Sequence, residues 1–170
     1  MDVLTASATP VDDIERSQAA WHRWLFDGDD AVTMQELRAA AYHRASRDAL
    51  LVMAQRGSWA ESWRWSGQSL WTADTRTAVA ASHRQPDLDL AGRIIDGFAR
   101  IADDAAMPTV ERANAHAAIA FLSWVCDDPA MAEAVALDAL ALNPAQRLAI
   151  ILTDTLAHGL VPLWKGKRRG

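Results

Sequence analysis

The chain has 170 residues, the length of one ordinary domain, and its single cysteine excludes an intrachain disulfide. Apolar residues make up 51%, much of it alanine, and no stretch reaches the roughly 20 uninterrupted apolar residues that a membrane-spanning helix needs. The net charge is −5. Four of the 17 basic residues lie at the C-terminal end, Lys165, Lys167, Arg168 and Arg169; without them, 13 basic residues oppose 22 acidic ones and the charge is −9. The acidic body of the protein should therefore repel nucleic acid.

The first helix is predicted to begin at Pro10, because proline suits a first helical turn and acidic residues follow it. It should end near Gly28 and bring Trp21 and Trp24, three residues apart, into contact. The N-terminal residues also lack the basic start and apolar run of a signal peptide, which favours a cytoplasmic location.

The next helices are predicted from capping residues. Thr33 and Glu36 form a capping-box pattern that opens a helix toward Arg44, and Ser46 is interpreted as the cap of a helix over residues 47–55. Residues 58–61 repeat the box pattern, whereas the weaker periodicity of residues 66–87 indicates at most a short helix over 75–82.

The C-terminal half has the clearest helical pattern. An amphipathic helix is predicted from Leu90, followed by an antiparallel hairpin over 109–142 that turns at residues 126–129. A closing helix over 145–158 is expected to bury four apolar side chains: Leu148, Ile151, Leu152 and Leu156. The predicted fold is thus an all-α, single-domain bundle of about seven helices over residues 1–164, with a basic disordered tail over 165–170.

The hairpin resembles the tetratricopeptide repeat, in which 34 residues form two helices packed through small side chains. With Pro144 at the terminal proline of the repeat, Ala120, Ala132 and Ala139 occupy its small-residue positions and Ile119 its leucine position. The aromatic positions of the repeat hold other residues: His116, Ser123 and Ala136. One copy is visible, so the remaining helices are expected to pack as a non-repeating bundle.

Four segments resemble the C-terminal helical part of an uncharacterised family of high-GC Gram-positive bacteria, a domain of unknown function. They are SRDALL (46–51), AFLSW (120–124), DDPAMAEAVALDALALNP (127–144) and LAIILTDTLAHGLVP (148–162). Members of that family usually have an α/β region ahead of the helices and often a Gly-Asp-Gly turn where this chain has Asp127-Asp128-Pro129. The resemblance therefore implies a fold and no known reaction.

Two groups of residues are candidates for binding a protein or peptide partner. The tetratricopeptide likeness implies that Asn114, Phe121 and Trp124 line a concave face, although two aromatics at this spacing are more typical of core packing. Trp63 and Trp65 lie among arginines, a pattern that is compatible with an exposed aromatic patch and more typical of a core anchor or a dimer interface. We therefore predict a protein-interaction module, adaptor or regulatory, and leave open whether it is a homodimer.

Two other functions, a nucleic-acid-associated regulator and an enzyme, are alternatives to this prediction. The basic residues Lys165, Lys167, Arg168 and Arg169 would give a nucleic-acid-associated regulator mainly nonspecific, salt-sensitive affinity. An enzyme would need a site formed by distant residues, since the sequence has no phosphate loop, no nucleophile elbow and no metal-ligand spacing. Cys126 beside two aspartates should have a disfavoured thiolate. No catalytic residue, metal or cofactor is predicted.

Overall fold

Helices form all the regular secondary structure in residues 10–56 and 84–166, the part of the chain described by the computed structural model. The all-α prediction is therefore confirmed, while the helix predicted over 75–82 and the capping box at 58–61 lie outside these residues. In chain order the elements are α1 (Pro10–His22), a π-helical turn η1 (Arg23–Asp27), α2 (Met34–Leu37), α3 (Ala39–Tyr42), α4 (Arg44–Arg56), α7 (Leu88–Ala102), α8 (Thr109–Val125), α9 (Pro129–Leu142), α10 (Arg147–Ala157) and α11 (Leu163–Gly166).

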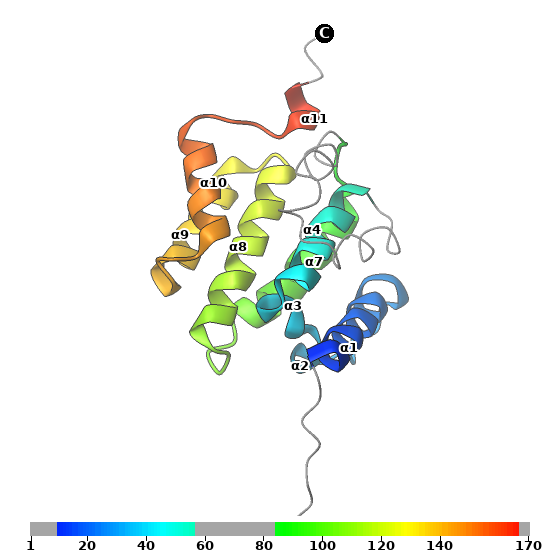
Figure 1. Cartoon of the computed structure of the whole chain (residues 1–170). Coiled ribbons are helices and arrows are strands. Elements are labelled where there is room, and N and C mark those ends of the chain that lie inside the picture. Colours follow the sequence, from blue (N-terminus) through cyan, green and yellow to red (C-terminus); the bar gives the residue numbers. More distant parts are fainter. Residues whose placement is uncertain (1–9, 57–83, 167–170) are drawn as a thin grey trace, which may run out of the picture.

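Helix α8 lies at the centre of the bundle. Figure 1 shows α9 and α10 on one side of it and α7, α4 and α3 on the other, and α8 contacts all five. Five fully buried alanines of α8 explain this position: Ala113, Ala115, Ala117, Ala118 and Ala120. Because an alanine side chain ends at Cβ, neighbouring helices can approach α8 closely from several directions.

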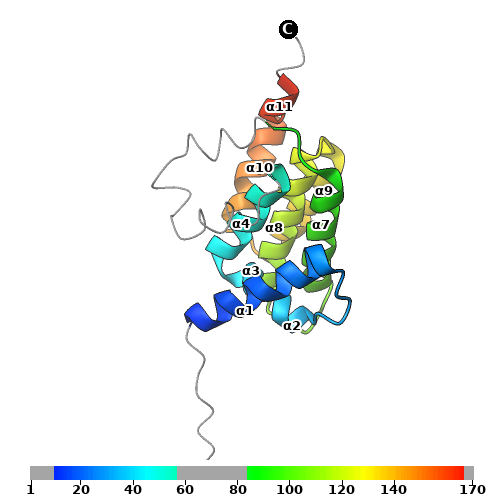
Figure 2. The same cartoon turned by 90° about the vertical axis from the view of Figure 1, so that its right-hand side faces the viewer.

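Two apolar clusters lie on opposite sides of α8. The larger one joins α1, α4 and α7 to α8, and its largest side chain is the fully buried Trp21. The Trp21 indole packs 5.1 Å from the Phe98 ring, between centroids, and donates a 3.1 Å hydrogen bond to the carbonyl oxygen of Leu37. The smaller cluster joins α8, α9 and α10 through alanines and Leu152. Trp21 therefore connects α1 to Leu37 of α2 and to Phe98 of α7. Figure 2 shows α1 beside α2.

Local signals account for three helix ends, and two of these, the end near Gly28 and the Thr33–Glu36 capping box, confirm predictions. Gly28 follows η1 with φ of 62°, a left-handed conformation that glycine adopts without a Cβ penalty. Thr33 and Glu36 form the predicted capping box at the start of α2. Asp128 caps α9 by accepting a hydrogen bond from the backbone N–H of Met131, directly before Pro129. The predicted hairpin is therefore formed by α8 and α9.

Two local predictions are wrong. Ser46 does not cap a helix: α4 begins at Arg44, and Ser46 lies buried within it, because the carbonyl of His43 already accepts a hydrogen bond from the N–H of Arg47. Ile151 is 38% exposed rather than buried, because Leu148 and Leu152 define the inner side of α10 and Ile151 lies on its flank.

Candidate functional site

The predicted partner residue Asn114 lies where three helices meet. Its amide nitrogen donates a 2.7 Å hydrogen bond to the carbonyl oxygen of Ala41 at the end of α3. Its amide oxygen accepts a 2.8 Å hydrogen bond from Nε2 of Gln146, the residue that caps α10. Both ends of the Asn114 amide therefore already form a hydrogen bond within the chain itself.

The two predicted aromatic partner residues are half-buried on α8. The rings of Phe121 and Trp124 lie 6.0 Å apart between centroids, and Phe121 packs against the larger apolar cluster. The Trp124 indole N–H donates a 3.1 Å hydrogen bond to the carbonyl oxygen of Leu160. One side of α8 thus brings Asn114, Phe121 and Trp124 together, and all three already contact other parts of the chain.

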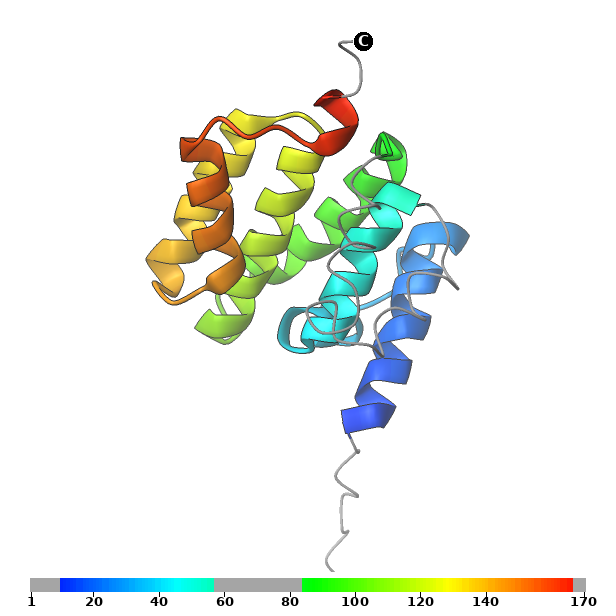
Figure 3. The ribbon, with the colours of Figure 1, turned by 45° about the horizontal axis from the view of Figure 1, so that its top comes forward.

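Residues 159–166 return from α10 across the end of α8, and we call this segment the C-terminal strap (Figure 3). Trp164 donates a 2.9 Å indole hydrogen bond to the carbonyl oxygen of Val125, and Lys165 forms an ion pair with Asp127. The prediction of a disordered tail from Lys165 onward is wrong for Lys165 and Gly166, since both belong to α11. The other predicted basic residues, Lys167, Arg168 and Arg169, lie outside the described residues, as do Trp63 and Trp65.

Large exposed apolar side chains gather at the C-terminal end of the described chain. They belong to α9, α10 and the strap: Met131, Leu137, Ile150, Ile151, Leu160, Val161 and Leu163. Along α9, Ala130, Ala134, Leu137 and Ala141 are all exposed and recur at helical spacing, so they share one outer side of the helix. This outer side carries no basic residue.

A second candidate site is a pocket of about 630 Å³ lined by side chains of α1, the α2–α3 segment and α8: Arg16, Ser17, Gln35, Glu36, Arg38, Ala39, Tyr42 and Glu111. Arg38 and Glu111 form a bidentate ion pair there. Nε and Nη2 of Arg38 donate hydrogen bonds of 2.6 and 2.8 Å to the two carboxylate oxygens of Glu111. These hydrogen bonds raise the pKa of Arg38 above its ordinary value.

Sequence reasoning missed the Arg38–Glu111 pair, because its members lie 73 positions apart. One signal was present: Glu111 precedes Ala115 and Ile119 at steps of four, so it shares the buried side of α8 with them. A carboxylate on a buried helix side requires a charged or hydrogen-bonding partner. The sequence could have indicated a buried glutamate, although not which residue would pair with it.

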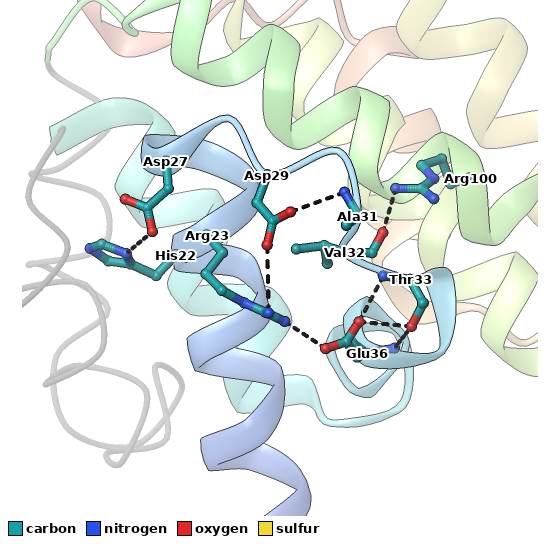
Figure 4. Close-up of polar contacts among 9 residues, drawn as sticks. All are labelled: His22, Arg23, Asp27, Asp29, Ala31, Val32, Thr33, Glu36 and Arg100. Carbon is teal, nitrogen blue, oxygen red and sulfur yellow. Dashed lines mark hydrogen bonds and ion pairs between the residues drawn. The ribbon is translucent and has the colours of Figure 1, made fainter.

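The wall of this pocket at α2 is held by the contacts drawn in Figure 4. Glu36 accepts hydrogen bonds from the backbone N–H and the hydroxyl of Thr33 at 2.7 and 2.9 Å, and from Nη2 of Arg23 at 2.5 Å. The same guanidinium lies 3.5 Å from an Asp29 carboxylate oxygen. The hydrogen bonds from Thr33, followed by that from Arg23, lower the pKa of Glu36. The end of η1 and the start of α2 are therefore held together by charge-assisted hydrogen bonds.

Replacing Thr33 with alanine should destabilise the protein by about 1 kcal/mol, the usual cost of losing an N-cap hydroxyl. It should also raise the pKa of Glu36 toward its ordinary value, because the Thr33 hydroxyl hydrogen bond is lost. Since the folded-state pKa is lowered, the stabilisation by Glu36 is present at neutral pH and declines as pH falls through that pKa. Urea unfolding at neutral and acidic pH checks this: the Thr33→Ala effect should shrink in acid, and Thr33→Ser should behave like the parent. An equal effect at both pH values would contradict it.

Other reactive groups give no evidence of chemistry in the described ranges. Burial raises the pKa of the Cys126 thiol, which agrees with the prediction that its thiolate form is disfavoured. The cause is desolvation rather than the charge of the neighbouring aspartates. Burial likewise lowers the pKa of His116. Within residues 10–56 and 84–166 no group of three or more histidine, cysteine or acidic side chains is placed to hold a metal ion. No helix of these residues has the length and apolar character needed to cross a bilayer.

No protein-family model, curated protein or solved structure matches this chain, so its function is argued from its own residues.

Proposed function

We propose that the chain is a cytoplasmic protein-interaction module that presents the outer side of α9 and its neighbour α10 to a basic amphipathic helix of a partner protein. The observation that carries this proposal is the exposure of Leu137 (55%) and Ile150 (46%) on helices whose other sides pack against the body. Location in the cytoplasm is part of this proposal and is supported by the single cysteine, since disulfide-bonded proteins belong to oxidising compartments.

Helix α9 is apolar on almost every side. Its 14 residues include two charged ones, Glu133 and Asp138. A helix of this kind is normally covered all round, because each exposed apolar side chain forgoes the free energy of burial. The body of the protein covers one side of α9, through Ala132, Ala136 and Ala139, and leaves the opposite side exposed. A partner helix would complete the burial.

The charges beside this surface select the partner. From Pro129 to His158 the chain has three carboxylates, Glu133, Asp138 and Asp154, against one basic residue, Arg147. All four side chains are exposed. A helix with an apolar stripe and flanking lysines or arginines would match both the apolar surface and its acidic border. A second copy of this chain would instead bring the same acidic border, so like charges oppose a symmetric pairing through this surface.

The resemblances found in the sequence are part of this proposal. An α8–α9 hairpin with alanines at its interface supports the tetratricopeptide-like interpretation. The likeness to the uncharacterised bacterial family concerns these helices together with α4, α10 and the strap. The proposed surface differs from the one that the repeat likeness implied. On α8, Asn114 is hydrogen bonded to α3 and to the N-cap of α10, and Trp124 to the strap, whereas the outer side of α9 is exposed.

The proposal is tested with a fluorescent leucine–lysine peptide of about 18 residues, which forms five helical turns. Fluorescence anisotropy should show binding, and Leu137→Ser/Ile150→Ser should weaken it about tenfold or more, since each lost apolar contact costs on the order of 1 kcal/mol. The matched control is Leu88→Ser/Val110→Ser, which removes side chains exposed to 57% and 56% on α7 and α8 and should change affinity by less than about twofold.

Three outcomes would overturn the proposal. The first is equal loss of binding in the two double variants, and the second is equal binding of a leucine–glutamate peptide of the same length. The third is a stable dimer, seen by light scattering and abolished by Leu137→Ser/Ile150→Ser, which would assign the surface to a second copy. Circular dichroism of each variant would show that its helix content is retained.

A further inference from the structure

The pocket beside the Arg38–Glu111 ion pair lies on a different part of the molecule from the outer surface of α9. At about 630 Å³ it falls within the size range of small-molecule sites. The ion pair itself is costly, because removing two charges from water often outweighs their attraction, and an apolar pair of similar volume would serve stability as well. A partly buried pair at the wall of a pocket, with Glu111 10% and Arg38 28% exposed, therefore suggests a ligand that uses it.

The carboxylates that line the pocket have no oxygen left without a partner. Both oxygens of Glu111 accept hydrogen bonds from Arg38. One oxygen of Glu36 accepts from Arg23, and the other accepts from Thr33. Both glutamates are therefore already paired with a guanidinium, and a cationic ligand would approach carboxylates whose charge is compensated.

Two groups at the pocket have hydrogen-bond donors that are largely unused. Nη1 of Arg38 makes one long contact, 3.5 Å to Oε1 of Gln35. The hydroxyl of Ser17, a residue 1% exposed, has no hydrogen-bond partner among the described residues. Buried polar groups normally have partners, so an unpartnered hydroxyl beside a pocket calls for an explanation. A ligand with acceptor oxygens would satisfy the exposed edge of the Arg38 guanidinium.

The apolar part of the pocket comes from Ala39 and Tyr42. The Tyr42 ring is partly exposed, and the carbon at the centre of the Arg38 guanidinium lies 5.8 Å from its centroid. A flat apolar group could lie against this ring while an acid group reaches Nη1 of Arg38. We propose that the pocket binds a small carboxylate with an aromatic or apolar body, held by Arg38 and packed against Tyr42.

Benzoate is the probe for this proposal, with chemical-shift titration of backbone amides as the measurement. Benzoate should shift amides near residues 16–17, 35–42 and 111, whereas benzylamine, which has a ring of the same size and a positive charge, should not. Arg38→Gln/Glu111→Gln keeps a hydrogen-bonded pair without charge and should weaken benzoate binding about tenfold or more. Arg147→Gln removes an exposed positive charge on α10 and should leave the affinity unchanged.

A second variant keeps the test decisive if the double variant does not fold. Tyr42→Ala removes a partly exposed ring and should weaken benzoate binding without changing the preference for benzoate over benzylamine. The proposal is overturned if benzylamine binds as well as benzoate, if the shifts lie elsewhere, or if Tyr42→Ala has no effect. Tighter binding of inorganic phosphate than of benzoate would also overturn the carboxylate class. None of these results bears on peptide binding by α9.

Discussion

Replacing Arg38 with alanine is expected to destabilise the protein by about 3 kcal/mol, the lower end of the usual cost of removing one partner from a buried ion pair. The physical reason is that Glu111, whose side chain is 10% exposed, would lose both of its hydrogen-bond donors while remaining enclosed. Arg38 is more exposed than Glu111, so water would compensate part of the loss. Urea unfolding followed by circular dichroism measures the change.

The matched control removes both charges together. Arg38→Met/Glu111→Leu keeps similar side-chain volumes and leaves no unpaired charge, so its stability should lie within about 1 kcal/mol of the parent. The Arg38–Glu111 pair would then contribute to specificity or to binding, and would add no net stability. If the double variant were as unstable as Arg38→Ala, the loss of stability would come from packing and not from the unpaired Glu111 carboxylate.

Replacing Gly97 with alanine is expected to destabilise the protein by about 2 kcal/mol, even though alanine is the better helix former by about 1 kcal/mol. A Cβ added at Gly97 would lie 2.5 Å from Cη2 of Trp21, well inside contact distance. Trp21 cannot move away easily, because it is fully buried, packs on Phe98 and is hydrogen bonded to Leu37. Thermal unfolding should show a lower Tm for Gly97→Ala.

Gly92 on the same helix is the matched control. A Cβ added there meets no atom within 4 Å, so Gly92→Ala should stabilise the protein by up to about 1 kcal/mol through helix propensity alone. Opposite signs at the two positions would show that α1 and α7 pack as closely as described. Stabilisation by both substitutions would contradict that close approach.

The helix ends that could be predicted are those encoded by neighbouring residues. The Thr33–Glu36 capping box and the Asp128-Pro129 start of α9 each depend on residues within three positions of one another, so spacing alone is sufficient to find them. Ser46 shows where such reasoning fails. A serine is equally compatible with a cap and with a helix interior, and the choice depended on the backbone of His43.

The contacts that define the candidate sites are distant in the sequence and could not be predicted. Asn114 was expected to face a partner, but its amide is bound by Ala41 and Gln146, which lie 73 and 32 positions away. Trp124 likewise pairs with Leu160, 36 positions later. Helical periodicity identifies which residues share a side of a helix and cannot identify which element covers that side. The outer side of α9 was therefore found only once α8 and α10 were seen on its inner side.

Methyl NMR of the protein with the leucine–lysine peptide tests the central claim most directly. Methyl groups of Leu137, Ile150 and Met131 should shift on addition of the peptide, because the proposed surface lies on α9 and the neighbouring side of α10. Those of the equally exposed Leu88 and Val110 should remain unchanged. Shifts at Leu88 and Val110 as large as those on α9, or no shifts on α9 at all, would contradict the assignment of α9 as the binding surface.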